Sequence, residues 1–124
     1  MKNEIINHCG SSPNAEQCGF VVVENGNLEI KPVINRSQNQ KQEFNISAQD
    51  FLYIKKNFEI VAVYHSHPQG DEKPSEFDCK MSELVCYPFL VFSINTRRFA
   101  LYTPENNDAN PEFLKKLIEQ VGAK

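Results

Sequence analysis

Two short apolar runs, at residues 18–23 and 59–65, dominate the hydrophobic pattern of the chain. Both are rich in β-branched residues, which is typical of strands buried on both faces. The dipeptide Asn25-Gly26 follows the first run and favours a type I′ turn, because both turn positions need positive φ. The sequence therefore predicts a hairpin that returns over residues 27–34, and a central strand over residues 59–65.

The rest of the pattern alternates between short strands and amphipathic helices. Ser47 and Ser75 each stand three residues before an aspartate, as in a capping box, and Asn110-Pro111 is typical of a helix start. Further strands are expected at residues 43–46, 88–94 and 99–103, and helices at residues 2–9, 47–56, 75–86 and 110–121. About six strands interleaved with four helices indicate one mixed β-sheet covered by helices, which fits an α/β or an α+β fold.

The length of 124 residues suits one ordinary domain, so we expect a single domain over residues 1–124. Two of the helices carry apolar residues that are expected to lie near the core. These residues are Phe51, Leu52 and Ile54 in the second helix, and Phe77, Met81, Leu84 and Val85 in the third.

The composition narrows the function classes. Apolar residues make up 40% and charged residues 23% of the chain, as in a soluble globular protein. The net charge of -3 and the scattered Lys and Arg residues argue against nucleic-acid binding. No apolar run approaches the roughly 20 residues that cross a bilayer, and the first residues do not resemble a signal peptide. We therefore expect a cytoplasmic protein with no membrane association, whose four cysteines are free thiols.

The candidate chemistry lies at the end of the expected central strand, in His65-Ser66-His67. Residues two apart on a strand share a face, so both imidazoles can point at one position. A polar loop follows, and it can carry Asp78 back to the same position. Two imidazoles and one carboxylate suit a catalytic Zn²⁺ whose fourth ligand is water. Glu16, in a polar loop before the first strand, is the candidate for the base that takes the proton of that water.

A purely structural interpretation competes for two of these residues. Ser75 and Asp78 have the spacing of a capping box at the start of a helix, and locally this explanation is the stronger one. The two roles are compatible, because an aspartate in a first helical turn keeps lone pairs for a cation. Glu16 by itself is a charged loop residue, and Glu24, Glu43 and Glu59 flank strands in the same way.

The spacing of His65, His67, Ser75 and Asp78 is the complete JAMM signature, His-x-His, seven residues, Ser, two residues, Asp. The chain thereby resembles the JAMM/MPN-domain zinc metallopeptidases. The stretch at residues 13–22, with Glu16 before Cys18-Gly19, is similar to the N-terminal domain of phage tail assembly proteins of the lambda K type. The resemblance implies an MPN fold, which is related to the cytidine-deaminase-like fold.

The resemblance also assigns roles. It implies that His65, His67 and Asp78 hold Zn²⁺, that Glu16 acts as general base and then proton donor, and that Ser75 hydrogen-bonds the oxyanion. The implied activity is hydrolysis of a peptide or isopeptide bond in a protein or peptide substrate, by a metallopeptidase of phage or prophage tail assembly.

Three alternatives remain open from the sequence. The chain fits a bacterial deconjugase of ubiquitin-like proteins, a non-catalytic tail scaffold with a structural zinc, and a metal-free interaction domain. A scaffold needs the metal ligands but not Glu16, and the interaction domain needs neither. The residues give no indication of the substrate or the oligomeric state.

Overall fold

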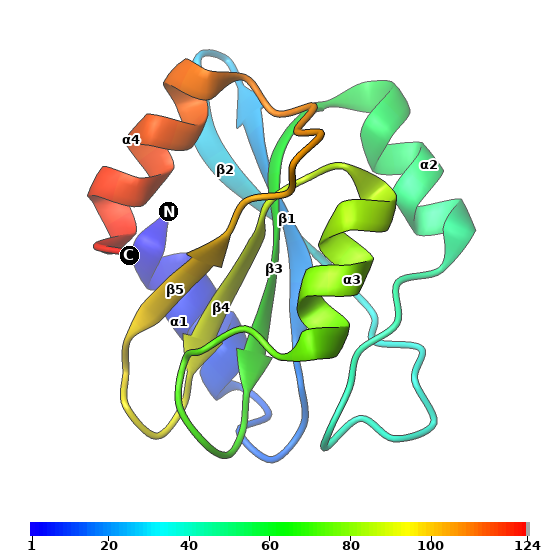
Figure 1. Ribbon diagram of the computed structural model, residues 1–124, viewed down its shortest axis with the longest axis vertical. Coiled ribbons are helices and arrows are strands. Elements are labelled where there is room, and N and C mark those ends of the chain that lie inside the picture. The colour runs from blue at the N-terminus through cyan, green and yellow to red at the C-terminus, as the bar shows by residue number, and fades with distance from the viewer. Residues whose placement is uncertain (124) are drawn as a thin grey trace.

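The computed structural model describes residues 1–123, which form four helices and one five-stranded sheet with the strand order β2-β1-β3-β4-β5 (Figure 1). The helices are α1 (Lys2–Gly10), α2 (Ala48–Asn57), α3 (Glu76–Val85) and α4 (Pro111–Val121). The strands are β1 (Cys18–Glu24), β2 (Asn27–Val33), β3 (Glu59–His67), β4 (Phe89–Ser93) and β5 (Phe99–Tyr102). The expected mixed α/β architecture is confirmed.

The sheet combines antiparallel and parallel pairs around β3. Strand β1 runs antiparallel to both β2 and β3, whereas β3 and β4 are parallel and β5 returns antiparallel to β4. The β1–β2 turn has positive φ at both Asn25 (53°) and Gly26 (78°), as the type I′ prediction requires. Strand β3 is therefore central, as expected, and its crossover to β4 includes α3.

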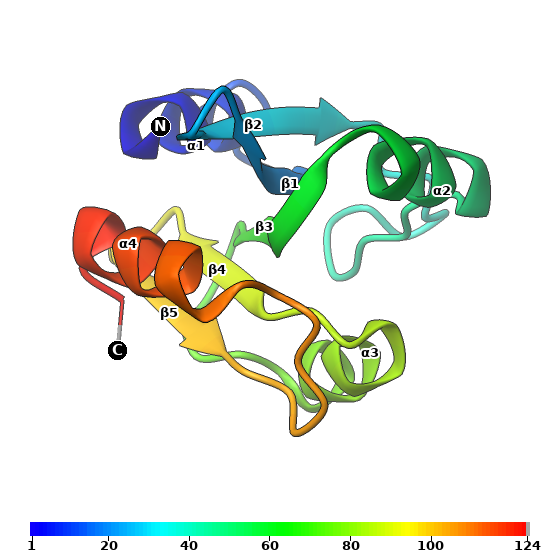
Figure 2. The same cartoon turned by 90° about the horizontal axis from the view of Figure 1, so that it is seen from above.

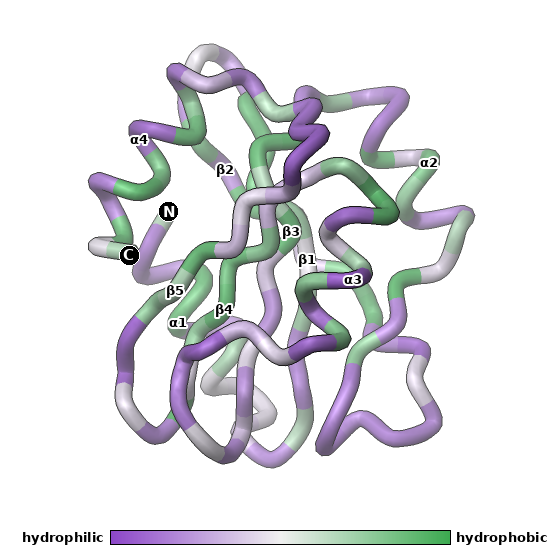
Figure 3. The backbone as a smooth tube through the Cα atoms, viewed as in Figure 1, coloured by the Kyte–Doolittle hydropathy of each residue, from purple (hydrophilic) through white to green (hydrophobic). Residues whose placement is uncertain are grey.

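Two helices cover each face of the sheet: α1 and α4 lie on one side, and α2 and α3 on the other (Figure 2). Alternate side chains of β1 supply both cores, since Val21 packs in the cluster with α1 and α4, and Phe20 in the cluster with α2. Hydrophobic residues concentrate along the strands, and the loops at the lower end of the view are mostly hydrophilic (Figure 3). Of the candidate site residues, Glu16 precedes β1 and Ser75 precedes α3, whereas His65 and His67 lie at the end of β3 and Asp78 in the first turn of α3. None of the helices over the described residues is long and apolar enough to cross a membrane.

The sixth strand predicted at residues 43–46 is wrong. This segment lies outside the sheet, and its backbone is hydrogen-bonded to the segment that follows β2. The Asn35 side chain accepts a hydrogen bond from Asn45 N (3.0 Å) and donates one to Glu43 O (3.1 Å), while Arg36 N donates to Asn45 O (2.8 Å). Two of these three hydrogen bonds use the Asn35 side chain where a strand would use a backbone partner, so no strand ladder forms.

Three of the apolar residues expected near the core are exposed instead. Leu52 in α2 is 63% exposed, and Leu84 in α3 is 74% exposed. Helical spacing identified the helices, but it did not identify which apolar side chain at the boundary faces solvent. Phe77 is 46% exposed, in the first turn of α3.

Candidate active site

The two candidate histidine ligands lie on one face at the carboxyl end of β3, with ring centroids 5.2 Å apart. His65 is fully buried and stacks on the Phe44 ring at a centroid distance of 4.3 Å. His67 lies at the last position of the strand and is partly exposed. The strand therefore presents one imidazole from inside the fold and one at its edge.

Asp78 reaches both imidazoles from the first turn of α3. Its Oδ1 lies 3.0 Å from His65 Nε2, and its Oδ2 lies 3.1 Å from His67 Nε2. Ser75 is the N-cap: Asp78 N donates to Ser75 Oγ (3.0 Å), and Ser75 N donates to Asp78 Oδ2 (2.9 Å). This capping box holds the carboxylate over the histidines, so Asp78 serves the helix start and faces the site as well.

The donor set fits a divalent cation. One ligand atom each from His65, His67 and Asp78 lie within 4.8 Å of one another. Both ring nitrogens of His65 are buried without a hydrogen-bond partner among residues 1–123, because its 3.0 Å contact with Asp78 lacks hydrogen-bond geometry. A buried imidazole nitrogen without a partner is costly in an apolar environment, and coordination to a metal would remove that cost at the nitrogen that faces Asp78.

The hydrogen bonds around His67 set its tautomer. Its Nδ1 lies 2.9 Å from Asp71 O, and a carbonyl can only accept, so Nδ1 carries the proton. In the neutral ring, Nε2 then has a free lone pair directed towards Asp78. A backbone carbonyl on the far nitrogen is a common way of orienting a metal-ligating histidine.

Glu16 lies on the same side of the sheet as the histidines. Glu16, His67 and Ser75 line one pocket of about 240 Å³, together with Lys41, Gln42, Pro68 and Gln69. Glu16 is only 6% exposed, and burial raises its pKa to about 7, with the Asp78 and Glu43 charges adding to the rise and His67 opposing it. A carboxyl group with a pKa near neutrality is suited to accept and return a proton.

Ser66 and Asn35 hold the backbone around Glu16, and neither was singled out from the sequence. Gln17 N donates to Ser66 Oγ (2.9 Å), and Ser66 N donates to Gln17 O (3.0 Å), so Ser66 ties the loop to the histidine strand. On the other side, the Asn35 side chain donates to Glu16 O (2.9 Å), and Glu16 N donates to Gln40 O (2.6 Å). The position of Ser66 between the two histidines was a usable signal, whereas nothing local marked Asn35.

The electrostatics of the ligand set differ from one side chain to the next. For Asp78, burial alone would raise the pKa, but the two adjacent imidazoles of His65 and His67 and the hydrogen bond from the Ser75 amide hold it well below its usual range. Burial lowers the pKa of His65. For His67 burial also acts to lower the pKa, yet the bonds to Asp78 and Asp71 O outweigh it and the pKa is raised. The site thus pairs an ionised carboxylate with a neutral buried imidazole.

Comparison with known proteins identifies the family. Residues 1–104 match the family of prokaryotic homologs of the JAB domain. The chain belongs to this family. The expected membership of the JAMM/MPN group is confirmed, and the matched region contains all five candidate residues, Glu16, His65, His67, Ser75 and Asp78.

Two further proteins are similar to this JAB-domain chain. It is 27% identical over 89 residues to the "Tail tip assembly protein K" of Escherichia phage N15, a match that covers 72% of this chain and 37% of that protein. The chain thus spans little more than a third of the length of that relative. The solution structure of protein DSY2949 from Desulfitobacterium hafniense has a TM-score of 0.61 at 20% identity, covering 75% of this chain and 70% of that one, and supports the fold.

Proposed function

We propose that this JAB-domain chain is a zinc-dependent peptidase or isopeptidase of the JAMM type. His65, His67 and Asp78 would hold the ion, and Glu16 would act as general base. The observation that carries the proposal is the convergence of two imidazoles and one carboxylate beside a pocket that Glu16 also lines. A ligand set of three protein side chains leaves a fourth tetrahedral position open, as catalytic zinc sites do.

A Zn²⁺ ion held by His65, His67 and Asp78 would lower the pKa of a bound water from about 15.7 to about 7 and would polarise the scissile carbonyl. Glu16 accepts the proton of the attacking water and delivers it to the leaving amine. Glu16 is buried, and its pKa of about 7 suits both steps. Glu16 is not among the side chains that converge on the ion, which leaves its carboxylate free for proton transfer.

Ser75 can serve both as a helix cap and as an oxyanion donor. Its Oγ accepts the hydrogen bond from Asp78 N, which uses a lone pair and leaves its hydroxyl proton free. Within residues 1–123 this hydroxyl donates to no other group, and it lines the same pocket as Glu16 and His67. A donor aimed at an oxyanion typically contributes about 10²–10³ in rate.

The biological setting we propose is phage or prophage tail assembly, in the tail or the host cytoplasm. The support is the similarity to the tail tip assembly protein of phage N15, so the substrate would be a tail protein. A deconjugase of ubiquitin-like proteins would use the same site on an isopeptide bond. A non-catalytic tail scaffold would retain the ion as a structural clip and would have no need of Glu16.

The decisive experiment compares the wild-type protein with Glu16→Gln, both loaded with zinc. The probes are unfolded casein and a set of internally quenched peptides, assayed for new amino termini. We expect equal zinc content in the two proteins and hydrolysis only in the wild type. Retained hydrolysis in Glu16→Gln contradicts Glu16 as base. Zinc binding by the wild type with no cleavage of any probe, and normal tail assembly by the variant, favours the scaffold instead.

A further inference from the structure

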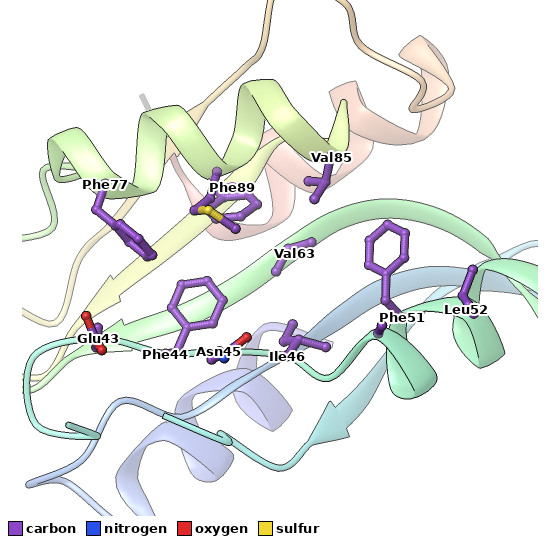
Figure 4. A pocket seen from close by; sticks show the side chains of 12 residues that line it. Glu43, Phe44, Asn45, Ile46, Phe51, Leu52, Val63, Phe77, Val85 and Phe89 are labelled. Carbon is purple, nitrogen blue, oxygen red and sulfur yellow. The ribbon is translucent and has the colours of Figure 1, made fainter. Parts of the chain in front are cut away.

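An apolar groove opens beside the proposed metal site, between α2, α3 and the segment at residues 43–46 (Figure 4). Its volume is about 740 Å³. Phe44 and Phe77 project into it from opposite walls, Val63 and Phe89 form its floor, and Phe51 and Leu52 stand at its other end.

The groove is unusual because large apolar side chains at its rim are open to solvent. Phe77 is 46% and Leu52 is 63% exposed, although both lie in an otherwise well-buried fold. Leaving such side chains in water is unfavourable by about 25 cal/mol per Å² of apolar surface, and gathered exposed apolar residues commonly mark a binding site. These two residues are therefore candidates for contact with a ligand.

The groove is continuous with the metal site. Phe44 forms one wall of the groove, and its ring stacks on the His65 imidazole at 4.3 Å. Phe77 directly precedes the ligand Asp78 in the first turn of α3. A polypeptide whose scissile bond sits at the ion would therefore pass the mouth of this groove.

The dimensions fit a short stretch of extended peptide. The groove follows α3 from Phe77 to Val85, which at 1.5 Å per residue is about 12 Å. An extended peptide advances about 3.3 Å per residue, so about three to four residues cover this length. The lining is mostly aromatic and aliphatic, with Glu43 and Asn45 as its polar members, and this favours an apolar side chain over a charged one.

We propose that this groove binds one large aliphatic or aromatic side chain of the protein substrate, within about three residues of the scissile bond. The groove thereby gives the peptidase a sequence preference. This inference rests on the proposed peptidase function, and its test is designed so that the two can fail separately.

The test measures binding without turnover. Zinc-loaded Glu16→Gln protein is titrated with two blocked heptapeptides, Gly-Gly-Gly-X-Gly-Gly-Gly, in which X is Leu or Ala, and the amide shifts are followed by NMR. Burial of the longer side chain predicts that the Leu peptide binds at least about tenfold more tightly. The largest shift changes are expected at residues that line the groove, such as Met81 and Ile46.

Two matched pairs of variants locate the site. Leu52→Ala and Phe77→Ala remove groove side chains, while Tyr53→Ala and Leu84→Ala remove neighbours on the same two helices that are 62% and 74% exposed and do not line the groove. We expect the preference for the Leu peptide to fall to near one in the first pair and to persist in the second. Zinc content and melting temperature are recorded for each variant. If Phe77→Ala is unstable, the test relies on Leu52→Ala, which lies far from the metal ligands.

Three results overturn the inference. The first is equal affinity for the Leu and Ala peptides, and the second is a Leu preference that survives both groove variants. The third is a lower sedimentation coefficient in the groove variants alone, which makes a second copy of this chain the occupant. None of these depends on turnover, so they are separate from a failure of the wild type to hydrolyse any probe.

Discussion

Replacing Glu16 with Gln should stabilise the metal-free protein, by an amount that grows as the pH rises above 4.5 and is complete above pH 7. Burial raises the pKa of Glu16 from 4.5 to about 7, so the folded state holds this proton more tightly than the unfolded state. Below pH 4.5 the carboxyl is neutral in both states and contributes no penalty relative to Gln. Between pH 4.5 and 7 the unfolded state loses the proton first, and stability falls as pH rises.

The size of the effect follows from the same shift. At about 1.36 kcal/mol per pKa unit, a rise from 4.5 to about 7 corresponds to about 3 kcal/mol of lost stability above pH 7. Gln has nearly the same shape and carries no charge, so Glu16→Gln removes this penalty. The variant should therefore match the wild type at pH 4 and exceed it by up to about 3 kcal/mol at pH 8.

The assay is urea denaturation of both proteins at pH 4, 6 and 8 in the presence of EDTA, since a bound cation would itself lower the pKa of Glu16. Glu59→Gln is the control, because Glu59 is an exposed carboxylate at the start of β3 and its replacement should change stability by less than about 0.5 kcal/mol. Two results would contradict a Glu16 pKa raised by burial. One is a Glu16→Gln variant that is less stable than the wild type at pH 8, and the other is a difference in unfolding free energy between the two proteins that does not change with pH.

Three further substitutions test other parts of the structure. His67→Ala leaves two protein ligands and should sharply reduce zinc affinity, so stoichiometric zinc by elemental analysis would contradict the ligand assignment. Ser75→Ala removes the helix cap and the free hydroxyl. Denaturation should show that the free energy of unfolding falls by about 1 kcal/mol, and peptidase assays that the rate of hydrolysis falls about 10²-fold or more. Full activity would leave Ser75 only the capping role. Gly19→Ala would place a Cβ 2.5 Å from Tyr64 Cε2 and 2.7 Å from Lys31 O. We expect it to lower the melting temperature, with a cost of about 1–3 kcal/mol; an unchanged melting temperature would show that Tyr64 moves aside.

The sequence predicted the fold well where local signals and burial agreed. The type I′ turn at Asn25-Gly26 and the apolar run of β3 each specify one structure, and the caps at Ser47 and Ser75 fix the starts of α2 and α3. The segment at residues 43–46 has the composition of a strand, yet it lies outside the sheet. The reason is a distant side chain, Asn35, which no local pattern reveals.

The candidate site was predictable in composition but not in its supports. The spacing of His65, His67 and Asp78 indicated a shared position, because strand periodicity and a helix start fix where each side chain points. The link between the Glu16 loop and β3 depends on two hydrogen bonds between Gln17 and Ser66, which are 49 residues apart in the sequence: Gln17 N donates to Ser66 Oγ, and Ser66 N donates to Gln17 O. Such long-range contacts leave no periodic signal, and the exposed groove beside the site has none either.

The most direct test of the account is an anomalous difference map from crystals grown with zinc, collected on both sides of the zinc absorption edge. We expect a single strong peak about 2.0–2.2 Å from His65 Nε2, His67 Nε2 and one Asp78 oxygen, with the Glu16 carboxylate facing it without coordinating it. A peak elsewhere on the molecule, or no peak at this position from zinc-saturated crystals, would contradict it.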